Sequence, residues 1–96
     1  MCGIVGFFGG QDNVIHDLVD GLTALQHRGQ DSAGIVTFSK TFHIKKGLGL
    51  VNNVFKEKNI KRLIGNIGIG HVRYTTQGTN ELINVQPFAV NYPFGL

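Results

Sequence analysis

The sequence contains a single cysteine and no tryptophan among its 96 residues. One cysteine cannot form an internal disulfide, and by itself it cannot supply a cysteine metal site or an iron–sulfur cluster. The four histidines show no zinc-like spacing, so no metal site is predicted. A chain without disulfides is most simply placed in a reducing cytoplasm.

Long hydrophobic runs are also absent, and charge is sparse. No stretch reaches transmembrane length, and the N-terminus lacks the basic and apolar regions of a signal peptide. The net charge is +3, with lysines gathered at residues 45–46 and 56–62. Because no aromatic residues alternate with them, these lysines favour a solvated helix face over a nucleic-acid surface. We therefore expect neither a membrane nor a nucleic-acid partner, and an RNA-binding fragment is the weaker alternative.

Glycine is abundant, with 14 residues, about twice the average usage. The glycines stand beside the ends of expected strands and turns, which indicates tight turns and close backbone approach. A chain of this length forms one small domain with a modest core.

Hydrophobic periodicity predicts an α+β domain. The expected strands cover residues 4–8, 32–38, 42–46 and 65–74, with a further strand beginning at Gln86; a helix is expected over 14–25, one or two short helices within 52–63, and a loop over 75–85. Asp12 or Asn13 is expected to cap the first helix, and Gly29 to end it. Alternation places Ile67, Ile69, His71 and Arg73 on one strand face, with Arg73 at the rim of the core, where it can meet a ligand.

Cys2 directly follows the initiator methionine. Once Met1 is removed, Cys2 carries a thiol and a free α-amine on the same carbon. The thiolate is the nucleophilic form, and the two groups titrate near about 8.5 and about 8, so the amine is a suitable base for the thiol. The alternative is a small apolar residue at the start of a buried strand.

Three further segments are rich in polar residues. Residues 25–35 (LQHRGQDSAGI) form a polar connection between a helix and a strand. Residues 70–78 (GHVRYTTQG) place a guanidinium, suited to carboxylate recognition, beside two threonine hydroxyls. Residues 84–88 (NVQPF) contain a proline that fixes a turn. Taken alone, each of these segments also fits an ordinary loop.

Together with the opening MCGIVG, these segments resemble the class II glutamine amidotransferases, a branch of the N-terminal nucleophile hydrolases. The resemblance covers nearly the whole chain and is strongest to the branch that passes ammonia to phosphoribosyl pyrophosphate, the first step of purine biosynthesis. It implies a four-layer αββα sandwich, incomplete in this chain. Residues 1–96 would be the N-terminal part of the amidotransferase domain, without the phosphoribosyltransferase domain.

The resemblance also implies roles for individual residues. Cys2 would attack the side-chain amide of glutamine, forming a thioester and releasing ammonia. Arg73 would hold the glutamine α-carboxylate, with Thr76 beside it and Tyr74 shaping the pocket. Arg28 would lie near the nucleophile without contacting the substrate. The oxyanion-hole and amine-binding residues are expected beyond Leu96, so this stretch alone is expected to be inactive.

Further expectations concern the whole enzyme. No cofactor is expected in this chain; Mg²⁺ is expected in the missing transferase domain, and a homo-oligomer at full length. Two alternatives remain open: another class II amidotransferase, of the sugar-phosphate or asparagine-forming type, and a non-catalytic module of the same fold.

Overall fold

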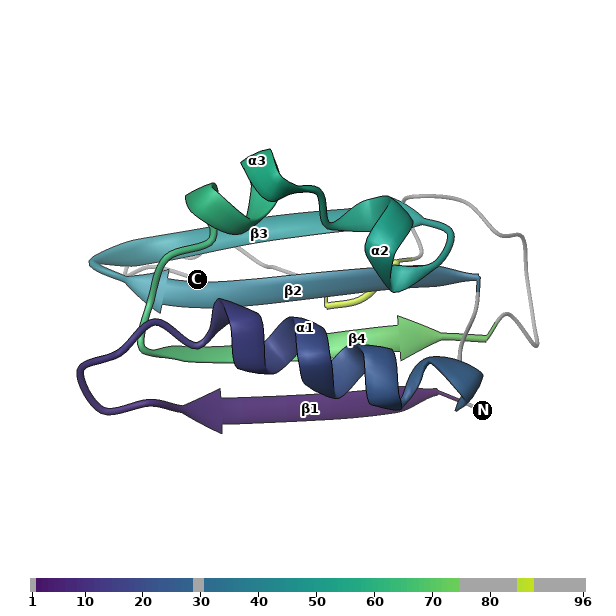
Figure 1. The fold of residues 1–96 in the computed structure, drawn as a ribbon, viewed down its shortest axis with the longest axis horizontal. Helices are drawn as coiled ribbons and strands as arrows, with labels where there is room; N and C mark the ends of the chain where they lie inside the picture. Colours follow the sequence, from purple (N-terminus) through teal and green to yellow (C-terminus); the bar gives the residue numbers. More distant parts are fainter. Residues whose placement is uncertain (1, 29–30, 75–84, 88–96) are drawn as a thin grey trace, which may run out of the picture.

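The computed structural model describes residues 2–28, 31–74 and 85–87. One four-stranded antiparallel sheet, in the order β1-β4-β2-β3, carries helices on one face (Figure 1). The elements are β1 (Gly3–Phe8), α1 (Ile15–Ala24), the 3₁₀ helix η1 (Gln26–Arg28), β2 (Ser32–Ser39), β3 (Thr41–Leu48), α2 (Val51–Val54), α3 (Glu57–Arg62) and β4 (Ile67–Arg73). In this described part, no helix is long and apolar enough to cross a membrane.

The structure confirms most of the expected elements. The predicted strands are β1, β2, β3 and β4, and the segment 52–63 forms the two short helices α2 and α3. The β2–β3 hairpin turns at Lys40, whose φ is 63°. The expected loop lies outside the described residues over 75–84. The expectation that Gly29 ends the first helix is wrong, because α1 ends at Ala24 with Leu25 as its C-cap, and η1 follows.

Two further local predictions were wrong. The N-cap of α1 is Val14, without a side-chain cap, because the Asn13 Oδ1 atom instead accepts a hydrogen bond of 2.9 Å from the Gly65 backbone N–H. This bond ties the start of α1 to the segment entering β4. Gln86 and Pro87 form a bend rather than the start of a strand, and residues 88–90 lie outside the described part.

The core lies between the sheet and the helices. It is formed by apolar side chains of α1, α2, β2, β4 and the segments around α3: Val14, Ile15, Leu18, Leu22, Ala33, Ile35, Val51, Val54, Phe55, Leu63 and Val72. Leu18, Leu22 and Ile35 are fully buried. Helix α1 supplies the largest share of these core side chains, because its apolar residues recur at helical spacing and so lie on one face of the helix.

The core-facing side of β4 differs from the prediction. Gly68, Gly70 and Val72 face the helices, whereas Ile67 and Ile69 are 46% and 50% exposed on the opposite side. A Cβ at Gly68 would stand 2.7 Å from Leu18 Cδ1, and one at Gly70 would stand 2.9 Å from Leu22 Cδ1. Glycine therefore lets α1 approach the sheet closely, and Arg73 lies on the face that the helices leave uncovered, which we call the open face.

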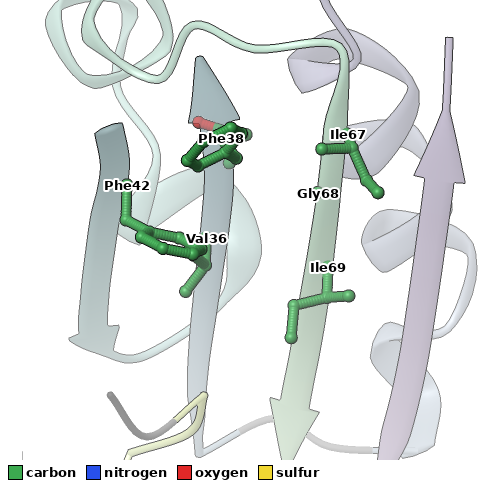
Figure 2. Close-up of a pocket in the computed structure, with 7 residues that line it drawn as sticks. Val36, Phe38, Phe42, Ile67, Gly68 and Ile69 are labelled. Carbon is green, nitrogen blue, oxygen red and sulfur yellow. The ribbon is translucent and has the colours of Figure 1, made fainter. Parts of the chain in front are cut away.

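One half of the open face is apolar. Val36, Phe38, Phe42, Ile67 and Ile69 line a groove of about 400 Å³ (Figure 2). Phe38 and Phe42 pack across the hairpin with ring centroids 4.9 Å apart. The described residues thus form one helical layer and one sheet, as in one half of the expected αββα sandwich, and the sheet presents an apolar surface on the side away from the helices.

The segment Val85–Pro87 crosses the other half of the open face. A Cβ at Gly34 would lie 2.1 Å from the Gln86 carbonyl oxygen and 2.8 Å from Pro87 Cδ, and Val85 is 1% exposed. Gly34 is therefore the position that lets this segment lie against β2. Gly34 from the polar segment before β2 and Gln86–Pro87 from the later one therefore meet here.

Replacing Gly34 with alanine should destabilise the protein by about 1–3 kcal/mol, because the new methyl group cannot fit beneath the Gln86 carbonyl. Gly6→Ala is the matched control. Gly6 of β1 also points to the open face, and a Cβ there would meet its nearest neighbours at an ordinary 3.8 Å. Thermal unfolding of both variants tests this. Equal melting temperatures for the two variants would contradict the prediction.

Candidate functional site

The strand register brings Cys2 and Arg73 to the same place. Gly3 pairs with Val72 in the β1–β4 ladder, so continuing the register by one residue sets Cys2 opposite Arg73. Gly3 and Val72 face the helices, and side chains alternate along a strand. Cys2 and Arg73 therefore both project from the open face, at the end of the sheet where β1 begins and β4 ends.

The same row continues into the next two strands. Ser32 of β2 pairs with Arg73, and Leu48 of β3 pairs with Ser32. The order across the open face is thus thiol, guanidinium, hydroxyl and leucine side chain. Directly opposite residues in an antiparallel sheet have Cβ atoms about 4.5–5.5 Å apart, so neighbours in this row can interact.

The structure describes the side chains of three of the five predicted site residues. Cys2 is exposed, Arg73 is half-buried, and Tyr74, directly after β4, is 51% exposed. Thr76 lies outside the described residues, as does the side chain of Arg28. The backbone of Arg28 belongs to η1, which is held to α2 by a 2.8 Å hydrogen bond from the Val51 N–H to Gln26 Oε1.

Gly3 fixes the position of the neighbouring nucleophile candidate. A Cβ at Gly3 would stand 3.1 Å from Leu25 Cβ and 3.1 Å from Val72 Cγ2. The start of β1 therefore packs closely between the end of α1 and β4. This packing fixes the backbone next to Cys2 relative to β4 and the end of α1.

Two buried polar side chains beside Arg73 were missed as site residues by the sequence analysis. Ser32 is 1% exposed and His71 is 8% exposed. Ser32 Oγ and His71 Nδ1 have no hydrogen-bond partner among the residues that the structure describes. Both lie on the open face, Ser32 opposite Arg73 and His71 two residues before it. Only the strand pairing reveals that they converge.

His71 is held in a neutral state more strongly than an ordinary histidine. Burial lowers the pKa of its imidazole below the usual 6.5, and the neighbouring Arg73 guanidinium lowers the pKa further. His71 therefore adds no positive charge beside Arg73 at neutral pH, and the cationic side chain in its row is the half-buried Lys46, which pairs with Gly34. Chemically, the row offers a thiol beside a guanidinium, which suit a nucleophilic attack on a substrate that carries a carboxylate.

Metal-binding side chains do not gather in the described part of the chain. No group of three or more His, Cys, Asp or Glu residues lies close enough there to hold an ion.

Comparison with curated proteins finds relatives along the whole chain. The sequence is 53% identical to an amidophosphoribosyltransferase of Pseudomonas aeruginosa and 50% identical to one of Escherichia coli, with 100% of this chain aligned in each case. It is also 50% identical to an amidophosphoribosyltransferase of Methanocaldococcus jannaschii over 99% of the chain. The chain spans only 19–21% of the length of these relatives. No family model matches the sequence.

Solved structures agree with this comparison. A structure described as the allosteric regulatory enzyme of purine biosynthesis matches 97% of this chain with a TM-score of 0.86 and 35% identity. Glutamine phosphoribosylpyrophosphate amidotransferase from B. subtilis, complexed with ADP and GMP, matches 96% of this chain with a TM-score of 0.82 and 34% identity. The chain covers 20% and 19% of those two chains. The predicted fold class, a partial α+β sandwich of the N-terminal nucleophile hydrolase type, is confirmed.

Acid should destabilise the protein through His71. Since the folded-state pKa lies below 6.5, the unfolded chain binds more protons than the folded protein in the window between that pKa and 6.5. The free energy of unfolding should therefore fall as the pH falls through this window. His71→Gln should lose less stability than the wild type between about pH 7.5 and about pH 5, as measured by melting temperature. An equal loss in both proteins would contradict this assignment.

Proposed function

Because this chain is homologous from end to end to the N-terminal part of amidophosphoribosyltransferases, we propose that it forms the glutaminase half-site of such an enzyme. It would release ammonia from glutamine for the synthesis of 5-phosphoribosylamine from phosphoribosyl pyrophosphate. The observation that carries the proposal is the placement of Cys2 opposite Arg73 on one face of the sheet. That pairing sets a nucleophile beside an anchor for a carboxylate.

Cys2 is the proposed nucleophile. After removal of Met1, its α-amine takes the thiol proton, and the thiolate attacks the side-chain amide carbon of glutamine. The resulting tetrahedral intermediate expels ammonia, which leaves with the transferred proton, and a thioester remains. Water then hydrolyses the thioester to glutamate and restores the thiol. The exposure of Cys2 supports this role, because a nucleophile must be reached by its substrate.

Arg73 is the proposed anchor for the glutamine α-carboxylate. A guanidinium presents parallel N–H donors that match a carboxylate, and its place in the middle of the row fixes the substrate relative to Cys2. Tyr74 would form part of the pocket wall next to this anchor. We assign Thr76 to the same pocket, and Arg28 to support of the nucleophile, from the resemblance of their sequence segments.

The remaining steps belong to the rest of the enzyme. We propose that ammonia passes to a phosphoribosyltransferase domain, where it displaces pyrophosphate from phosphoribosyl pyrophosphate with Mg²⁺ bound. Oxyanion-hole donors and a group for the substrate amine would follow Leu96 in the sequence. We further propose that the full-length enzyme is a homo-oligomer. We also propose that it is cytoplasmic, which is consistent with the low cysteine content.

Cys2→Ser in the full-length protein should abolish glutamine-dependent synthesis and leave ammonia-dependent synthesis largely intact. The hydroxyl is a far weaker nucleophile than the thiolate, while external ammonia bypasses the step. Assays with glutamine and with ammonium salt measure the two activities. Loss of both in a folded variant would argue against a separate glutaminase site.

Arg73→Ala in the full-length protein should raise the KM for glutamine, at a cost of about 2–5 kcal/mol if the charge pair is desolvated. Ammonia-dependent synthesis should not change. Arg62→Ala is the matched control, since Arg62 is exposed on α3 and its guanidinium donates only to the Ile44 carbonyl among the described contacts, at 3.2 Å. An unchanged glutamine KM in Arg73→Ala would remove Arg73 from the binding role.

A further inference from the structure

Ser32 combines three properties that an ordinary core serine lacks. Its side chain is 1% exposed, and its hydroxyl has no hydrogen-bond partner among the described residues. It also stands opposite Arg73, on the same face of the sheet. Buried hydroxyls are nearly always hydrogen-bonded. An unpaired buried hydroxyl at a candidate site therefore indicates that it gains a hydrogen-bond partner when the substrate is bound.

The opposite face of the same strand shows the contrast. Thr37 is fully buried against the helices, and its Oγ1 donates a 2.8 Å hydrogen bond to the Ile64 carbonyl. That hydroxyl stabilises the fold. Leaving the Ser32 hydroxyl unpaired instead costs stability, because the group has lost water without gaining a protein partner. The two hydroxyls of β2 thus have opposite energetic roles.

We propose that Ser32 is a positioning residue for Arg73, an inference that rests on the glutaminase function proposed above. The separation of directly opposite Cβ atoms, about 4.5–5.5 Å, allows the Arg73 Nε–H to reach Ser32 Oγ when the arginine side chain lies along the sheet. This hydrogen bond leaves both terminal nitrogens of the guanidinium for a bidentate pair with the α-carboxylate of glutamine.

The neighbours of Ser32 favour this partner. On its other side in the row stands Leu48, which offers no polar atom, and two residues along β2 is Gly34, which has no side chain. Lys46 and His71 flank Gly34 in the next row and lie diagonal to Ser32, so Arg73 is the directly opposite residue with N–H donors. Arg73 carries five N–H donors, more than a carboxylate can accept. Ser32 therefore orients the guanidinium toward the row position of Cys2 without itself touching the substrate.

The test uses the full-length protein and three variants, Ser32→Ala, Ser32→Thr and Thr37→Val. Ser32→Ala should raise the glutamine KM about tenfold, corresponding to about 1.4 kcal/mol, with ammonia-dependent activity unchanged. Its melting temperature should stay equal or rise, because a costly unpaired hydroxyl is gone. Ser32→Thr keeps the hydroxyl and should retain most of the glutamine affinity. Thr37→Val should show the reverse pattern, with a lower melting temperature and an unchanged KM.

A second comparison separates this inference from the proposed function. In an Arg73→Ala background, Ser32→Ala should add no further increase in KM, because the residue acts through the arginine. If Arg73→Ala raises the KM but Ser32→Ala does not, the positioning role fails while the proposed function stands. If neither variant changes the KM, the proposed site itself fails. A Ser32→Ala variant that unfolds at lower temperature with normal KM would show a purely structural hydroxyl.

Discussion

The pairing of β4 between β1 and β2 is the constraint on which the candidate site depends. Figure 1 shows β4 between β1 and β2. Residues 2, 73 and 32 are far apart in the sequence, and the registers of these two ladders, the first continued by one residue, place them in one row. A slip of one residue in either ladder would turn the side chains of the slipped strand to the helical face. Core packing on that face, where Val72 meets the helices beside Gly3, therefore also sets the geometry of the polar row.

The open face is divided along the strands into a polar and an apolar end. At one end the row is Cys2, Arg73, Ser32 and Leu48; three rows away it is Phe8, Ile67, Phe38 and Phe42. The apolar end supplies a surface for a second layer of the sandwich, and the groove in Figure 2 belongs to it. The polar end lies beside the crossing segment at Gly34, which covers part of the face. One sheet face thus serves packing and chemistry at separate ends.

Local patterns predicted the elements well, and the site only in part. The spacing of apolar residues identified α1 and all four strands. The position of Cys2 and the guanidinium of Arg73 selected two candidate site residues before any pairing was known. Period-two alternation also grouped Ile67, Ile69, His71 and Arg73 on one face, but it could not say that glycines, rather than these apolar residues, face the helices. The decisive information was the fit of Leu18 and Leu22 against Gly68 and Gly70, which depends on tertiary contacts. Ser32 was missed because cross-strand register is not a local property.

The charge at the polar end follows from the same packing. His71 stands next to Gly34 in the adjacent strand, and burial together with Arg73 lowers the pKa of its imidazole, so that it stays neutral where a free histidine would begin to charge. Neutral His71 leaves the Arg73 guanidinium as the positive charge of this row. A guanidinium beside the neutral Cys2 and Ser32 side chains can form a bidentate pair with one carboxylate. The packing that buries His71 therefore also limits the positive charge beside Arg73 to that of Lys46, which stands in the same row as His71.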